Sequence, residues 1–259
     1  MESKLLLPTR NLIPFRPPLS RRSKLSYSTV LAVLARPTDS FRNSSKPADI
    51  VPGLTGKTVY NDNWFEQLAV NHLSQSVQAV TEMRNSKSGY DGLVQAAVDA
   101  SRKFSLIEQR EIVIQALHKA IPEVILNLIK AVLPQSKFTR EYFATFTTLF
   151  FAWLVGPCEV RESEFNGTAE KNVVHIKKCR FLEETSCVGM CTNLCKVPTQ
   201  TFIKNSMGMA VNMVPNFEDM SCEIIFGQDP PALTEDAAFS QPCYKLCKAN
   251  QKHITKCSS

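Results

Sequence analysis

Cysteine is the residue type in this 259-residue chain most able to do chemistry, and all nine cysteines lie between Cys158 and Cys257. Three of them are four residues apart, at positions 187, 191 and 195. On a helix such residues share one stripe, because each step of four residues advances only about 40° around the axis. Further cysteines precede and follow this stripe. The candidate metal ligands are Cys179, Cys187, Cys191, Cys195, Cys222, Cys243 and Cys247.

A group of thiols of this size can converge on one metal centre. Thiolates select iron-sulfur clusters, Zn²⁺ or Cu(I), and four are enough to saturate a cluster or a tetrahedral ion. No pair has the two-residue spacing typical of zinc knuckles and ferredoxins, so the spacing alone does not choose the metal. The alternative is that several of these cysteines are small buried hydrophobic residues, as free cysteine often is. Cys158 and Cys257 lie outside the pattern.

The first 46 residues differ in composition from the rest of the chain. They hold nine Lys and Arg residues against two acids and are rich in serine, which is typical of an organelle transit peptide, although a disordered basic arm would look similar. Residues 47–60 are predicted to be a linker. The remaining residues carry 21 basic and 22 acidic side chains, so the body of the protein lacks the basic face that a nucleic acid partner requires.

The odd number of cysteines bears on their role. In a protein delivered to a reducing compartment, it argues against a disulfide framework and for metal or redox chemistry. The sequence contains no phosphate loop, dinucleotide fingerprint, serine nucleophile elbow or paired-histidine helix. The common enzyme classes that depend on those motifs are therefore excluded.

Helical patterns that could position these thiols fill residues 61–157. Apolar residues recur at helical spacing over 64–80 and 90–102. Ser105 and Glu108 have the spacing of a capping box and predict a helix through Ala120. Pro122 suits the first turn of a following helix that stops at Pro134.

An uncharged stretch of seventeen residues, 142–158, ends this helical region. It is shorter than the roughly 20 residues of a membrane span and predicts a buried helix. The functional alternatives are the wall of an apolar tunnel or a face that rests on a membrane, and both are compatible with a helix. The candidate tunnel-lining residues are Phe143, Phe146, Phe150, Trp153 and Leu154.

Strand patterns follow beyond residue 158. Residues 160–165 and 172–178 flank Asn166-Gly167, which favours a tight β-hairpin turn, and 209–214 and 221–226 indicate two more strands. The predicted fold class is α+β, with a helical N-terminal half followed by a small antiparallel sheet and a Cys-rich helix. The Cys-rich metal-binding region is predicted at 158–250, with a tail at 251–259.

Several longer blocks of residues carry a family resemblance. They are Phe151-Ala-Trp-Leu-Val-Gly-Pro157, Lys178-Cys-Arg-Phe-Leu-Glu-Glu184, Cys187-Val-Gly-Met-Cys-Thr-Asn-Leu-Cys-Lys196 and Pro215-Asn-Phe-Glu-Asp-Met-Ser-Cys222. With these blocks the chain resembles, from about Trp64 to Lys248, the plastid iron-containing β-carotene isomerase family of strigolactone biosynthesis, the dwarf-twenty-seven type. Such blocks are far more specific than a cysteine spacing.

The resemblance implies a chloroplast enzyme that reversibly converts all-trans-β-carotene to the 9-cis isomer. The implied cofactor is iron, either mononuclear or in an iron-sulfur cluster, and the preference for iron over zinc rests on the resemblance. The implied partner is an apolar carotenoid, with the protein either stromal or peripherally attached to plastid membranes. The sequence assigns no catalytic residue and no oligomeric state.

Two other functions share the cysteine pattern. An iron-sulfur electron-transfer protein or oxidoreductase would oxidise or reduce a partner. A zinc-stabilised interaction module would be colourless and redox-silent and would not catalyse a reaction.

Overall fold

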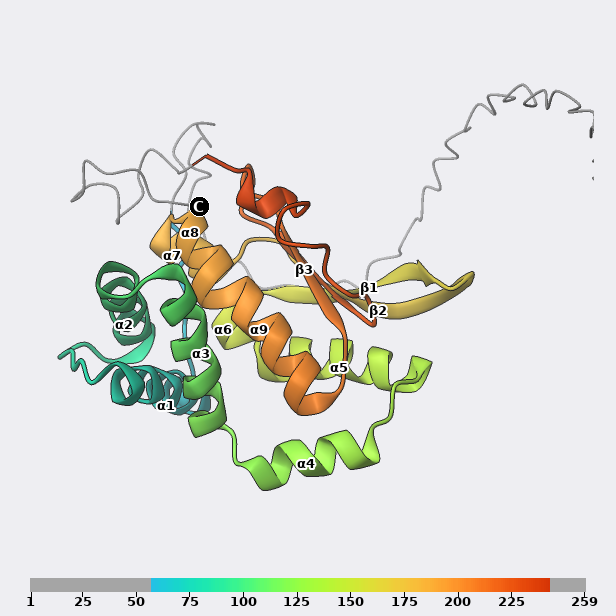
Figure 1. Ribbon diagram of the computed structural model, residues 1–259, viewed down its shortest axis with the longest axis horizontal. Coiled ribbons are helices and arrows are strands. Elements are labelled where there is room, and N and C mark those ends of the chain that lie inside the picture. The colour runs from blue at the N-terminus through green and yellow to red at the C-terminus, as the bar shows by residue number, and fades with distance from the viewer. Residues whose placement is uncertain (1–56, 243–259) are drawn as a thin grey trace, which may run out of the picture. The chain divides into compact units, whose positions relative to one another are not determined.

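The computed structural model describes residues 57–242 (Figure 1). The predicted transit peptide 1–46, most of the linker, Cys243, Cys247 and the predicted tail 251–259 lie outside the described residues. The region boundaries predicted from composition therefore stay predictions.

Four helices form the first part of the described chain, and each begins and ends close to the predicted residues. They are α1 (Trp64–Thr81), α2 (Gly89–Lys103), α3 (Leu106–Ala120) and α4 (Glu123–Val132). The predicted capping box is confirmed, because the Ser105 hydroxyl accepts from the Glu108 N–H and the Glu108 carboxylate accepts from the Ser105 N–H at 2.8 Å. A second capping box, from Asn63 and Glu66, opens α1.

The uncharged stretch 142–158 does not form the single buried helix that its composition predicts. Helix α5 (Lys137–Phe150) starts earlier and ends within the stretch, and a short α6 (Ala152–Val155) follows. Leu149 and Phe150 at the end of α5 are 72% and 47% exposed. Gly156, at φ +97°, ends α6, and a Cβ there would lie 2.8 Å from the Lys178 carbonyl oxygen. Only glycine permits this close approach.

Four antiparallel strands form the sheet, in the order β1-β2-β4-β3. They are β1 (Cys158–Phe165), β2 (Thr168–Ile176), β3 (Val211–Pro215) and β4 (Cys222–Phe226). The β1–β2 turn has positive φ at Asn166 and Gly167, 50° and 77°, as expected for a two-residue hairpin. All four predicted strands are confirmed, as is the α+β class.

The Cys-rich segment between β2 and β3 is helical. A short α7 (Arg180–Thr185) precedes α8 (Val188–Cys191), which continues through a π-helical turn (Thr192–Lys196) into α9 (Val197–Phe202) and a second π-helical turn (Ile203–Met207). Figure 1 shows this rod running alongside β3. A 3₁₀ turn (Ala237–Phe239) ends the described chain's regular structure.

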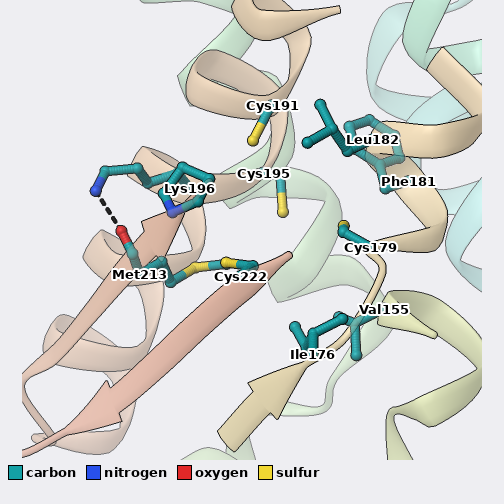
Figure 2. Close-up of a pocket in the computed structure, with 11 residues that line it drawn as sticks. Val155, Ile176, Cys179, Phe181, Leu182, Cys191, Cys195, Lys196, Met213 and Cys222 are labelled. Atoms are coloured by element: carbon teal, nitrogen blue, oxygen red, sulfur yellow. Dashed lines mark hydrogen bonds between the residues drawn. The ribbon is translucent and has the colours of Figure 1, made fainter. Parts of the chain in front are cut away.

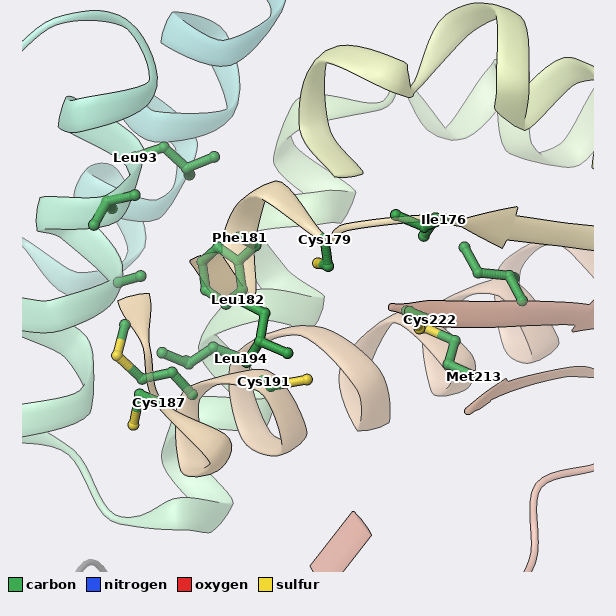
Figure 3. Packing of buried hydrophobic residues seen from close by; sticks show 14 of the residues in the cluster. Leu93, Ile176, Cys179, Phe181, Leu182, Cys187, Cys191, Leu194, Met213 and Cys222 are labelled. Carbon is green, nitrogen blue, oxygen red and sulfur yellow. The ribbon is translucent and has the colours of Figure 1, made fainter. Parts of the chain in front are cut away.

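One hydrophobic core joins the helices to the sheet. Leu93 of α2, Leu182 of α7 and Ile176 of β2 belong to the same buried cluster (Figure 3). Among the described residues, no single helix is long and apolar enough to cross a membrane. Helices α3 and α4 reach that length and composition only together, and they bend by 88° where they meet.

Candidate metal centre

Strand pairing brings the first two cysteines of the site together. Ile176 at the end of β2 pairs with Cys222 at the start of β4. Cys179 lies three residues beyond Ile176, and its backbone N–H donates to the Met220 carbonyl oxygen at 2.7 Å. The antiparallel register therefore places two cysteines that are 43 positions apart in the sequence at the same end of the sheet.

The Cys-rich rod supplies two more thiols. Cys191 is the last residue of α8, and Cys195 lies in the π-helical turn that follows it. A π-helical turn holds more residues than an α-helical turn, and such turns often occur at functional sites. Both thiols face the space next to Cys179 and Cys222 (Figure 2).

These four cysteines line one apolar pocket. Its other walls come from the ends of the surrounding elements, namely Val155, Ile176, Phe181, Leu182, Lys196, Met213 and Pro215. The cavity measures about 20 Å³, which is room for a body the size of a water molecule and not for a long polyene.

Burial dominates the electrostatics of the four thiols. It raises the pKa of Cys195 to about 12 and the pKa values of Cys179, Cys191 and Cys222 above the usual thiol range. Mutual repulsion between the thiolates raises the pKa values of Cys191, Cys195 and Cys222 further, so ionisation of one opposes ionisation of the next. Without a cation in the pocket, the four groups stay protonated thiols at neutral pH.

A buried cation lies at the edge of the pocket. Lys196 is 2% exposed, and its ammonium forms an ion pair with Asp236 at 2.8 Å and donates to the Met213 carbonyl oxygen. Its positive charge acts to lower the pKa of Cys191 and of Cys222, against the larger effect of burial.

The residue after Cys179 is also a buried cation. Arg180 makes two hydrogen bonds to the Asp62 carboxylate and one to the Trp153 carbonyl oxygen. Its guanidinium lies 4.3 Å from the ring centre of Tyr60 and 3.8 Å from that of Tyr90. These contacts hold the start of α7, and with it Cys179, against the segment before α1.

The donor set fits iron in its chemistry, since four soft thiols surround one enclosed apolar space. Their present spacing is wider than one ion needs. Within residues 57–242, no three His, Cys, Asp or Glu side chains are arranged to hold a single metal ion. Binding would have to release the thiol protons and draw the sulfurs together.

The predicted ligands divide into three groups. The structure brings together Cys179, Cys191, Cys195 and Cys222. Cys187 is buried as the N-cap of α8 but does not line the pocket, and Figure 3 shows its sulfur pointing away from that of Cys191. The expected stripe of three thiols fails at this residue because its extended backbone, with φ at −139°, precedes the helix. Cys243 and Cys247 lie outside the described residues.

The predicted tunnel-lining residues occupy two environments. Phe143 and Trp153 are core residues, 7% and 9% exposed. Phe146 and Leu154 are half-buried, and Phe150 lies at the surface. The thiol pocket is lined by Val155 from this segment and by none of the five predicted residues.

Sequence reasoning missed the two buried cations. Lys196 directly follows Cys195 in a run of predicted ligands. That position was the sequence signal that could have indicated a cation beside the thiols. Asp62, Arg180 and Asp236 have no local pattern that would reveal their partners, because each ion pair joins residues at least 40 positions apart.

Known proteins of one family resemble this chain over its whole length. Residues 153–235 match the family described as Beta-carotene isomerase D27-like, C-terminal. The chain is 57% identical over 260 residues to the chloroplastic beta-carotene isomerase D27 of Medicago truncatula, covering all of both chains. It belongs to the beta-carotene isomerase D27 family.

A second member of the D27 family confirms the match. The chloroplastic beta-carotene isomerase D27 of Arabidopsis thaliana is 43% identical over 267 residues, covering 99% of this chain and all of the relative. No solved structure matches the chain. The matched C-terminal segment contains all four cysteines of the pocket.

Proposed function

We propose that this D27-family protein is a chloroplast β-carotene isomerase that interconverts all-trans- and 9-cis-β-carotene at an iron centre, the first step of strigolactone biosynthesis. The β-carotene isomerase activity and the chloroplast location are supported by two full-length relatives named chloroplastic beta-carotene isomerase D27. The observation that supports the iron centre is the apolar pocket lined by four thiols.

We assign the ligands within the D27 family fold as Cys179, Cys191, Cys195 and Cys222. Iron held there would supply reversible one-electron exchange with the polyene, which lowers the bond order of a double bond without net oxidation. Val155, Ile176 and Leu182 exclude water from the thiols. The Lys196 ammonium contributes a fixed positive charge beside the negative charge that the ligands acquire on losing their protons.

Substrate binding must use surface outside the pocket. A carotenoid has no polar handle, so its binding energy comes from apolar burial at about 25 cal/mol per Å². The cavity has no room for it, and the polyene therefore binds beside the thiols or widens their pocket. Phe146, Phe150 and Leu154 remain our candidates for this contact, because they leave apolar surface uncovered by the core.

The test is metal analysis and isomer chromatography on anaerobically purified protein. We expect bound iron, and conversion of all-trans-β-carotene with no net oxidation. Cys191→Ala and Cys195→Ala should lose both iron and activity, whereas the matched control Cys158→Ala, a half-buried thiol on β1 outside the pocket, should keep both.

Other outcomes would select another function. Net oxidation or reduction of a partner without isomerisation would indicate an electron carrier. Stoichiometric zinc and a colourless, inactive protein would indicate an interaction module. Full iron content and activity in both pocket variants would refute the assignment of these thiols.

A further inference from the structure

Helix α4 carries large aliphatic side chains on its outer face. Val124, Leu128 and Val132 are 79%, 61% and 62% exposed, and Ile125 is 48% exposed. Leu126 is the helix's fully buried residue, and Ile129 packs against the core. A helix on the surface of a globular protein usually turns polar residues outward, so the outer face of α4 is unlike an ordinary water-facing surface.

Helix α5, the next helix in the chain, carries an exposed apolar surface of its own, made of aromatic rings. Phe138–Tyr142, Tyr142–Phe146 and Phe146–Phe150 are stacked pairs with ring centres 6.3, 6.0 and 4.5 Å apart. Phe138, Tyr142 and Phe150 are all more than 40% exposed, and Leu149 beside them is 72% exposed. Figure 1 shows α4 at the bottom of the view and α5 above it, between α4 and the sheet, joined by a short connection.

The charges around α4 favour an anionic partner. Residues 119–138 contain three lysines, Lys119, Lys130 and Lys137, and a single acid, Glu123. All three lysines are exposed; the Lys130 ammonium also donates to the Asn205 carbonyl oxygen, and the Lys137 ammonium donates to the Ala169 carbonyl oxygen and lies 4.0 Å from the Glu141 carboxylate. Exposed apolar side chains with lysines nearby are typical of helices that lie in the interface of a membrane with anionic lipids.

We propose that this surface docks onto an anionic lipid bilayer. We name it the lipid face and define it as Val124, Ile125, Leu128, Val132, Phe138, Tyr142, Leu149 and Phe150. The proposal deepens the proposed function and rests on it for one argument, that a hydrocarbon substrate dissolves in membrane lipid. Helix α4 is too short to span a bilayer, so it lies in the plane of the interface.

Vesicle flotation of the full chain tests the proposal directly. We expect binding to phosphatidylcholine vesicles that contain phosphatidylglycerol and weaker binding to phosphatidylcholine alone. Leu128→Glu combined with Val132→Glu should weaken binding at least about tenfold, because it removes two apolar contacts and adds two negative charges. The matched control is Ile107→Glu, an 80% exposed position at the other end of α3. Equal loss in the control, or no loss in the double variant, overturns the proposal.

A tryptophan scan keeps the proposal testable if the charged variants fold poorly. Leu128→Trp and Phe138→Trp should be quenched by brominated lipid well beyond the wild-type background of Trp64 and Trp153, and Ile107→Trp should not. Absence of quenching at both lipid-face positions refutes docking. If light scattering shows that Leu128→Glu and Val132→Glu dissociate a dimer while vesicle binding is unchanged, the face belongs to a second copy and the proposal fails.

Activity measurements separate this proposal from the proposed function. The Leu128→Glu and Val132→Glu double variant should isomerise carotene in detergent at the wild-type rate but lose activity on carotene dissolved in vesicles. Flotation needs no metal, so the Cys191→Ala variant should still float. If Cys191→Ala shows that the thiols are not ligands, the flotation result stands independently.

Discussion

The guanidinium of Arg180 makes two hydrogen bonds to the carboxylate of Asp62, with N–O distances of 2.6 and 2.8 Å. This pair joins the segment before α1 to the residue that follows Cys179. The Arg180 side chain is almost fully buried, so its charge depends on Asp62 for compensation.

Asp62→Ala should therefore destabilise the protein. It leaves a buried guanidinium without its counter-charge, at a cost of about 3 kcal/mol in the free energy of unfolding, measured by urea denaturation. The control is Asp229→Ala, which breaks an exposed ion pair with Lys204 and should cost less than about 1 kcal/mol. Similar losses in the two variants would show that the buried pair has no special role.

The same segment limits where the predicted transit peptide 1–46 could be removed. The Thr58 N–H and the Tyr60 hydroxyl donate to the Glu183 carboxylate, at 2.8 and 3.1 Å, and Lys57 pairs with Glu184 at 2.7 Å. We expect the mature protein from chloroplast import to begin at or before Lys57, as read by mass spectrometry. A mature N-terminus beyond Asp62 would contradict this. A chain that begins at residue 64 should unfold at lower urea concentration than one that begins at residue 57.

Substitutions at Lys196 and Asp236 should have coupled effects on the free energy of unfolding. Lys196→Met leaves Asp236 buried and unpaired, and we expect a loss of about 3 kcal/mol or more in unfolding free energy. Adding Asp236→Asn, which keeps the hydrogen bond from the Ala238 N–H, should recover part of that loss. A double-mutant cycle measures the coupling. Strictly additive effects would mean that the pair contributes nothing beyond its separate residues.

Metal-free protein should lose stability at alkaline pH. The pKa of Cys195 rises from an ordinary value of 9.0 to about 12, chiefly through burial. The folded protein keeps this proton after the unfolded chain has lost it. The contribution of the Cys195 thiol to the free energy of unfolding is therefore fully present below about pH 9 and is lost as pH rises toward 12. One such thiol contributes a slope of at most about 1.4 kcal/mol per pH unit. Cys195→Ala should flatten the curve of urea stability above pH 9. An unchanged slope would contradict the raised pKa.

Local sequence signals predicted the elements better than the contacts between them. The capping box at Ser105 and the Asn166-Gly167 turn act within a few residues, so their outcomes could be read from the chain alone. The break at Phe151 and the exposure of Leu149 depend on how the uncharged stretch packs, and composition does not encode that packing.

The candidate site shows the same division. Cys191 and Cys195 were expected to lie together because they share a helical rod. Their meeting with Cys222 depends on the pairing of β2 with β4, a contact between distant residues that spacing could not supply. Cys187 has the same four-residue spacing, but its backbone is extended and the helix begins only at Val188, so helical periodicity does not include it.

The β2–β4 register also constrains the order of events during maturation. Successive side chains of a strand point to opposite faces, so a slip of one residue at the Ile176–Cys222 pair would turn the Cys222 sulfur away from the other three. The four-thiol pocket consequently does not exist until the last strand has joined the sheet in its correct alignment. An occupant that needs all four thiols is therefore held in full only once β4 has paired with β2 in this alignment.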